Sequence, residues 1–218
     1  MPQLIDVSHV VEDGLITYPG LPGPIVCDFL SREASKAHYD EGTTFQIGKI
    51  EMVANTGTYV DSPFHRYENG ADLSQLELGR LANLEGIVIE ARGQKRSLGI
   101  ELFKGLDLRG RAVLVRTGWD VNWAKPSYFE GHPFLTRAVA EYLRTAEAAM
   151  VGIDSLNIDD IRDGSRPVHT ILLGAGIPIA EHLCNLGSLP ESGFRFHAVP
   201  VKFRGVGTFP VRAYGVVE

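Results

Sequence analysis

Cysteine, basic clusters and long apolar runs are all scarce in this 218-residue chain. Its two cysteines, Cys27 and Cys184, allow at most one disulfide, so we expect a reduced, cytoplasmic protein. The longest apolar run, Ile171 to Ala180, contains two glycines and a proline and is too short to cross a bilayer. The opening segment MPQLIDVSHV has no basic stretch ahead of an apolar run, so no secretory signal is expected. A net charge of −6 without a basic patch argues against nucleic acid as a partner.

Several common catalytic motifs are also absent. No Gly-x-Ser-x-Gly segment occurs, which weighs against a serine hydrolase of that type. The glycine pairs Gly174-Ala175-Gly176 and Gly205-Val206-Gly207 complete neither a dinucleotide-binding nor a P-loop pattern. The chemistry must therefore come from other residues.

Apolar, β-branched runs predict a mixed α/β chain with many strands. We expect strands at residues 4–8, 14–18, 45–53, 86–90, 112–116, 150–153, 196–201 and 210–217. Apolar residues recur three and four positions apart from Pro133 to about Ala146, which predicts a helix, and a shorter helix is expected near Ser74 to Leu84. The strand at 112–116, the longer helix and the strand at 150–153 predict a β-α-β unit. Without repeats or linkers, residues 1–218 are predicted to form one domain.

The densest group of polar residues follows the predicted strand at 45–53. It reads Asn55-Thr56-Gly57-Thr58-Tyr59-Val60-Asp61-Ser62-Pro63-Phe64-His65. Pro63 lies between Asp61 and His65 and disfavours a regular helix, so a strand running into a loop is predicted, where catalytic groups are common. Asp-Ser-Pro is also an ordinary turn sequence, in which Asp61 would accept nearby backbone N–H groups. Spacing alone leaves both interpretations open.

A second candidate pair, His169 and Glu181, stands at the two ends of an apolar stretch. A glutamate at the end of such a stretch needs a partner if it is buried. The alternative is a glutamate at the edge of a strand or helix that faces solvent.

Together these segments resemble the cyclase family of metal-dependent hydrolases, which includes bacterial kynurenine formamidase and isatin hydrolase. The family motif His-x-Gly-Thr-His-x-Asp-x-Pro-x-His is matched at Gly57, Thr58, Asp61, Pro63 and His65. Asn55 and Tyr59 replace its first two histidines. The family's histidine and glutamate, twelve residues apart, correspond to His169 and Glu181. Further similarity at residues 6–9, 18–20, 116–119 and 152–154 extends the resemblance over most of the chain, which implies a cyclase-like swivelling β/β/α fold with mixed sheets and few helices.

The resemblance also implies site roles. The replaced histidines and Asp61 would hold one metal, and His169 with Glu181 would complete or bridge a second position. His65 would be the general acid/base.

The residues present favour one ion. Asp61, His169 and Glu181 offer two carboxylates and an imidazole, which leaves an open position for water on a single divalent cation. Asn55 could add an amide oxygen, and Tyr59 could donate a hydrogen bond to an oxyanion. Because oxygen donors favour harder ions, manganese or magnesium is expected alongside zinc.

Two functions follow. The first is an arylformamidase-like hydrolase that cleaves a small amide, formamide, lactam or lactone with a divalent metal and His65. The second is a metal-free relative that binds a small molecule in a polar pocket without catalysis. The resemblance also implies a homodimer or homotetramer.

Three other features have structural interpretations. His9 is expected at the surface, and Cys184 is expected to be a buried, unreactive thiol. The aromatic residues either pack in the core or an interface, or form a wall for a planar substrate; they are Trp119, Trp123, Tyr128 and Phe129.

Overall fold

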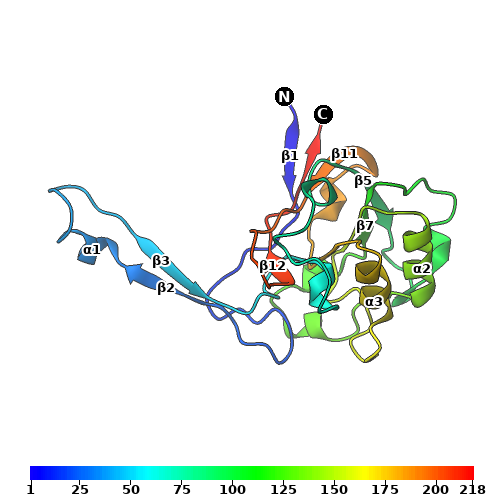
Figure 1. The fold of residues 1–218 in the computed structure, drawn as a ribbon, viewed down its shortest axis with the longest axis horizontal. Helices are drawn as coiled ribbons and strands as arrows, with labels where there is room; N and C mark the ends of the chain where they lie inside the picture. The colour runs from blue at the N-terminus through cyan, green and yellow to red at the C-terminus, as the bar shows by residue number, and fades with distance from the viewer.

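The computed structural model describes all residues, Met1–Glu218, and its framework is a nine-stranded mixed sheet (Figure 1). The strand order is β1-β13-β11-β5-β7-β9-β10-β4-β12. These strands are β1 Gln3–Asp6, β4 Tyr59–Asp61, β5 Leu84–Glu90, β7 Ala112–Arg116, β9 Met150–Ile153, β10 Ile179–Glu181, β11 Ser192–His197, β12 Thr208–Pro210 and β13 Tyr214–Val217. Two small sheets pair β2 Ile25–Leu30 with β3 Ile47–Glu51, and β6 Ser97–Leu98 with β8 Phe134–Leu135.

Three α-helices and six short 3-10 helices complete the fold. The α-helices are α1 Arg32–Ser35, α2 Arg137–Thr145 and α3 Pro167–Gly174. The 3-10 helices are η1 Pro63–His65, η2 Leu78–Arg80, η3 Ile100–Leu102, η4 Trp119–Asn122, η5 Pro126–Phe129 and η6 Leu186–Ser188. None of the helices is long and apolar enough to cross a membrane.

The centre of the sheet is buried on both faces. Strands β5, β7, β9 and β10 run parallel. Along β7, Val113 and Val115 join the core cluster that contains α2 and α3, whereas Ala112 and Leu114 join the cluster on the opposite face. A strand with side chains buried on both sides is apolar throughout, which explains why the central strands could be predicted from their continuous apolar sequences. The predicted β-α-β unit is confirmed, since β7 and β9 are parallel neighbours joined through α2.

An arm extends from this body (Figure 1). It consists of β2, β3 and the short helix α1 near its tip, and we call residues 25–51 the arm. β2 and β3 pair only with each other, and every residue of β3 is exposed. Large apolar side chains on the arm face solvent, including Phe29 at 76% and Ile50 at 63% exposure.

The mixed α/β fold class is confirmed, but several predicted elements are wrong. Residues 14–18 form no strand, because Gly14 has a φ of 71° and donates its N–H to Pro24 in a turn. The helix expected near 74–84 is only the short turn η2, since Asn83 takes a left-handed φ of 56°. Helix α2 begins at Arg137 because the preceding residues form β8. The stretch 210–217 is divided between β12 and β13, and β11 ends at His197.

Candidate metal and proton-transfer site

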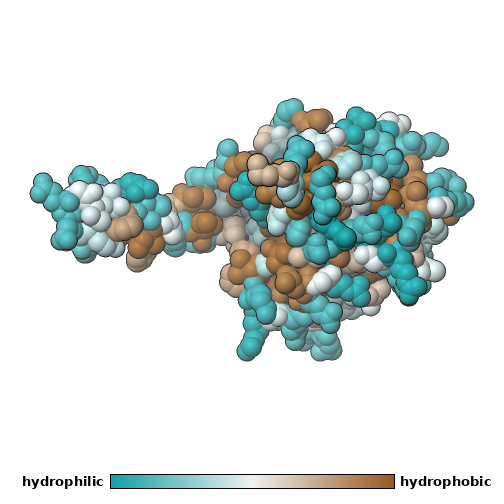
Figure 2. All heavy atoms as spheres, turned by 90° about the horizontal axis from the view of Figure 1, so that it is seen from above, coloured by the Kyte–Doolittle hydropathy of each residue, from teal (hydrophilic) through white to brown (hydrophobic).

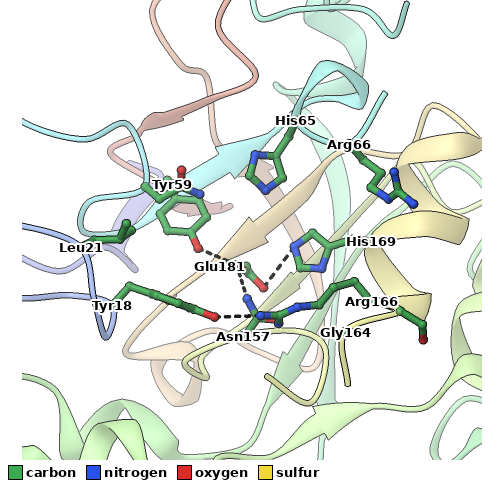
Figure 3. Close-up of a pocket in the computed structure, with 12 residues that line it drawn as sticks. Tyr18, Leu21, Tyr59, His65, Arg66, Asn157, Gly164, Arg166, His169 and Glu181 are labelled. Carbon is green, nitrogen blue, oxygen red and sulfur yellow. Dashed lines mark hydrogen bonds and ion pairs between the residues drawn. The ribbon is translucent and has the colours of Figure 1, made fainter. Parts of the chain in front are cut away.

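Antiparallel pairing of β4 with β10 and β12 brings the two polar segments together. In this register Tyr59 lies opposite Glu181, and Asp61 lies opposite both Ile179 and Thr208. Alternate residues of a strand point to the same face, so Tyr59 and Asp61 share a face with Glu181 and Thr208. The intervening Val60 packs into the core on the other face. The sheet therefore places residues more than a hundred positions apart in one site (Figure 3).

Helix α3 supplies His169, and a buried aspartate orients its ring. Asp159 accepts hydrogen bonds from the backbone N–H of Val168 at 2.8 Å and of His169 at 3.0 Å. The imidazole Nδ1 of His169 lies 2.7 Å from the same carboxylate. An ionised carboxylate only accepts, so Nδ1 carries a hydrogen, and Nε2 would present a lone pair to the site once a metal ion displaces its proton. Carboxylate–histidine pairs of this kind orient metal ligands in proteins.

Two carboxylate oxygens lie near His169 Nε2, one from Asp61 and one from Glu181. Nε2 lies 3.6 Å from Asp61 Oδ2 and 3.7 Å from Glu181 Oε1. Ligands of a tetrahedral ion with bonds of about 2.0–2.2 Å lie roughly 3.3–3.6 Å apart. Asp61 Oδ2 is buried and has no hydrogen-bond partner, which is unusual for a carboxylate oxygen unless a cation binds it. The Asp61 carboxylate and the His169 imidazole therefore belong to a group that could hold a divalent cation, and Glu181 lies next to His169.

The electrostatics of the site also favour a cation. Burial alone would lower the pKa of His169, but Glu181, Asp159 and Asp61 raise it to about 10. Burial disfavours ionised Asp61, yet the neighbouring His65 and His169 lower its pKa. Burial raises the pKa of Glu181 to about 7. A positive charge placed among these carboxylates stabilises their ionised forms.

His65 lies beside the donor atoms and is held by a threonine. Its Nδ1 is 2.9 Å from Thr208 Oγ1, whose hydroxyl donates to Asp61 Oδ1. The single hydroxyl hydrogen is committed to Asp61, so Thr208 accepts from Nδ1–H and the Nε2 of neutral His65 is left as a base. The backbone of Gly207 lies against this residue, because a Cβ at Gly207 would be 2.4 Å from the His65 nitrogen.

His65 is also close enough to be a ligand. One ligand atom from each of Asp61, His65 and His169 lies within 4.8 Å of the others. The His65 side chain is 36% exposed, however, while those of His169 and Asp61 are 7% and 0% exposed. An accessible imidazole can exchange protons with solvent, and the general acid/base role of His65 stays a prediction.

Tyr59 and Asn55, which replace the two histidines of the family motif, have different contacts in the site. The Tyr59 hydroxyl donates to Glu181 Oε2 at 2.6 Å. Burial and the Glu181 charge raise the pKa of Tyr59 well above its usual value, so it remains a phenol. Its one hydrogen is therefore used to hold Glu181, which corrects the expectation that Tyr59 donates to an oxyanion. Asn55 lines the same cavity as Tyr59 and His65.

The site opens into a cavity of about 350 Å³, a size suited to a small organic ligand. Its walls include residues that the sequence did not single out. They are Tyr18, Leu21, Arg66, Asn157, Gly164, Ser165 and Arg166, in addition to Asn55, Tyr59, His65, His169 and Glu181 (Figure 3). Asn157, Asp159 and Arg166 come from the loop between β9 and α3, where one polar loop among many gives no distinctive sequence signal.

The aromatic cluster packs behind this cavity instead of lining it. His182 is fully buried, lies 3.0 Å from the Tyr128 hydroxyl, and has a pKa lowered by burial to about 3. His9 is not a surface residue as expected; its ring stacks on Trp123 at 3.9 Å, and burial lowers its pKa to about 4. Neither Trp123 nor Tyr128 contributes to the cavity wall. The tyrosines that line the cavity are Tyr18 and Tyr59.

Comparison with known proteins gives a consistent family match. Residues 5–160 match the family model described as "Putative cyclase". The kynurenine formamidase of Geobacillus thermodenitrificans is 26% identical over 210 residues, which is 96% of this chain and 95% of that protein. The Bacillus cytotoxicus kynurenine formamidase is 27% identical with the same coverage.

Solved structures share the fold. One described as a potential metal-dependent hydrolase with cyclase activity superposes with a TM-score of 0.82 at 24% identity and covers 100% of this chain and 99% of its own. Isatin hydrolase A from Ralstonia solanacearum gives 0.84 at 19% identity and covers 100% and 92%. These likenesses extend over the whole sheet, the arm and the helices.

Proposed function

Because the chain belongs to the cyclase family of hydrolases, we propose that it uses one divalent metal ion to cleave a small amide, formamide, lactam or lactone. The observation that carries this proposal is that Asp61 Oδ2 and Glu181 Oε1 lie 3.6 Å and 3.7 Å from His169 Nε2, with the Asp61 oxygen without a hydrogen-bond partner. Kynurenine formamidases and isatin hydrolases act on C–N bonds of this chemical class, which supports the same reaction type here.

Asp61, His169 and Glu181 would hold the ion. A divalent ion there supplies a Lewis acid that polarises a carbonyl group and activates water. Manganese, zinc and magnesium are the candidates, because two carboxylates and one imidazole form a mixed, mainly oxygen donor set.

His65 would transfer the proton. Thr208 fixes the ring so that Nε2 is the basic atom, and Asp61 stabilises the imidazolium formed when Nε2 takes a proton. The same nitrogen then returns the proton to the departing amine or alkoxide. Tyr59 and Asn157 hold Glu181 in place, since both donate to its Oε2, at 2.6 Å and 3.3 Å.

Metal content tests the proposal against the metal-free alternative. Protein dialysed without chelator is expected to contain about one equivalent of divalent metal, measured by elemental analysis, and to hydrolyse members of a panel of formanilides, isatins and aryl lactones. Asp61→Asn should lose the metal, and His65→Ala should keep it and lose turnover. Asp107→Asn, which makes the same change at an exposed position, is the control. A wild-type protein that holds no metal and gains no activity from manganese, zinc or magnesium would support the metal-free binding relative.

We also propose that a second copy of the chain covers the arm, giving a homodimer or a homotetramer built from such dimers. A two-stranded hairpin alone is at best marginally stable in water, and this one exposes Phe29, Ile47 and Ile50. Figure 2 shows apolar surface along the arm and where it joins the body. Closed pairs are the commonest way in which identical chains cover such surfaces.

Light scattering after size exclusion tests this assembly. Wild-type protein should have at least twice the chain mass, and the double variant Phe29→Ser, Ile50→Ser should shift towards monomer. Leu78→Ser, at an exposed apolar position on the body, is the matched control. A wild-type monomer would overturn the assembly without affecting the hydrolase proposal.

A further inference from the structure

Two arginines line the cavity without acidic partners. Neither Arg66 nor Arg166 lies within ion-pair distance of a carboxylate, although Arg96, Arg116 and several surface arginines do. Glu181 is the only acidic residue in the cavity wall. With a divalent ion among Asp61 and Glu181, the cavity would carry an excess of positive charge from its arginines.

Arg166 is the better placed of the two. Its Nη1 donates to Asn157 Oδ1 at 2.9 Å and its Nη2 donates to the Tyr18 hydroxyl at 3.0 Å (Figure 3). Both partners are neutral, so they orient the guanidinium without compensating its charge, and three of its five N–H donors remain available. The residue adopts φ 43° and ψ 60°, a left-handed conformation that is costly for a side chain other than glycine or asparagine. The fold maintains this strain while directing the side chain into the cavity.

Arg66 is held differently. Its Nε donates to Thr170 Oγ1 at 3.3 Å, and its guanidinium lies 5.2 Å from the ring of Tyr67. It is exposed at the mouth of the cavity. Arg66 therefore contributes charge at the entrance, whereas Arg166 can contact a bound ligand inside.

Asn157 places Arg166 one side chain away from the reacting centre. Its Oδ1 accepts from Arg166, and its Nδ2 donates to Glu181 Oε2 at 3.3 Å. A ligand whose carbonyl faces Glu181 and His169 would thus have a neighbouring group beside the guanidinium. Guanidinium groups bind carboxylates strongly and with defined geometry, through paired charge-assisted hydrogen bonds.

We propose that the substrate is an anionic amide, lactam or lactone, with a carboxylate close to the bond that is cleaved, and that Arg166 binds this carboxylate. Planar N-acylated aminobenzoates have this chemistry, and Tyr18, Leu21 and Tyr59 offer apolar walls for their ring. The inference rests on the proposed function for the reaction, but binding of the carboxylate can be measured separately.

The deciding experiment compares two ligands that differ only in charge. Binding of 2-aminobenzoate and of 2-aminobenzamide to manganese-loaded protein is measured by titration calorimetry. Wild-type protein should bind the carboxylate more tightly than the amide. Arg166→Gln should weaken carboxylate binding by about tenfold or more, the usual effect of losing a charge-assisted hydrogen bond, and weaken amide binding much less, so that the preference for the carboxylate is lost. If the ligand carboxylate contacted only the metal ion, its affinity would not change in Arg166→Gln, which would contradict the proposal.

The control is Arg162→Gln, which removes the same charge from the same loop. Arg162 is exposed and paired with Asp160, at 2.8 Å, and does not line the cavity. It should keep the wild-type preference. If Arg166→Gln misfolds, Arg166→Lys keeps the charge and should retain part of the preference. A wild-type protein without preference, or an Arg166→Gln protein that keeps it, would overturn the inference.

A kinetic comparison separates this inference from the reaction itself. Values of kcat/KM for 2-formamidobenzoate and for formanilide should respond to Arg166→Gln as binding does, with a much larger loss for the carboxylate substrate than for formanilide. If no substrate is hydrolysed but carboxylate binding still depends on Arg166, the proposed function fails and the anion site stands. If both substrates are hydrolysed equally by both proteins, the function stands and the anion site fails.

Discussion

Replacing Asp159 with asparagine should weaken metal binding without removing any ligand. Asp159 is fully buried and accepts three N–H groups, two from the backbone at the start of α3 and one from His169 Nδ1. Asparagine has nearly the same shape but offers only one accepting oxygen and adds two donors. One of its two orientations leaves a backbone N–H facing an amide N–H. The other directs the amide donor at Nδ1, which moves the ring hydrogen to Nε2 and blocks the ligand lone pair.

The structure sets the size of both effects. One unsatisfied buried N–H costs about 1–3 kcal/mol of unfolding free energy. For a chain of this size, 2 kcal/mol corresponds to a Tm lowered by about 4–8 °C. Loss of the partner that orients a ligand histidine typically weakens metal affinity by about 10–100-fold. Competition with a chromophoric chelator measures the affinity, and calorimetry of the metal-free proteins measures the stability.

The matched control is Asp163→Asn, in the same loop. Asp163 accepts from the backbone N–H and hydroxyl of Ser165 and does not contact His169. It should keep the wild-type metal affinity. If Asp159→Asn lowers Tm yet binds metal as tightly as wild type, then His169 is not a ligand oriented by Asp159, and the assigned donor set is wrong.

Three further predictions follow from individual residues. Gly207→Ala should destabilise the protein by about 1–3 kcal/mol and reduce turnover, because the added Cβ would displace His65. Gly79→Ala, whose added Cβ meets no neighbour, should be near neutral. Denaturant unfolding and activity assays check both variants. Burial raises the pKa of Asp154 to about 6, so the Asp154 carboxyl binds a proton more tightly in the folded protein than in the unfolded chain. The stability that the protonated carboxyl contributes is complete below pH 3.8 and is lost as pH rises through 6. The unfolding free energy of wild type relative to Asp154→Asn should therefore fall by about 1 kcal/mol from pH 5 to pH 7, and a difference that rises instead would contradict the raised pKa. Burial raises the pKa of Cys184 to about 12, so a thiol reagent at pH 8 should modify Cys27 in the native protein and Cys184 only after unfolding, as peptide mass spectrometry would show.

Sequence reasoning succeeded where one local pattern determines the structure. The strand Ala112–Arg116 was predicted at its observed bounds, because a strand buried on both faces is apolar at every position. Asp61 and His65 were assigned through the family motif, since their spacing around Pro63, which begins η1, also fits an ordinary turn. His169 and Glu181 were identified from the family spacing and are brought to Asp61 by the pairing of β4 with β10.

The partners of these residues could not be found in the same way. Thr208 reaches His65 through pairing of β12 with β4, a contact between positions 143 apart. Arg166 depends on a left-handed backbone conformation that no arginine prefers. Of the arm, β3 lies within the strand predicted at 45–53, but β2 was missed because it is exposed at nearly every position and shows neither a continuous apolar run nor regular alternation.

The two replaced histidines affect the number of metal ions through hydrogen bonding as well as through lost ligands. A glutamate that bridges two ions must offer one oxygen to each. Here Glu181 Oε2 already accepts from the Tyr59 hydroxyl and from Asn157 Nδ2, while Oε1 faces His169 and accepts only from the backbone N–H of Ile158. Tyr59 thus occupies the side of Glu181 from which a second ion would bind, and its raised pKa keeps the hydrogen in place. This hydrogen bonding therefore supports the proposal of a single ion instead of two.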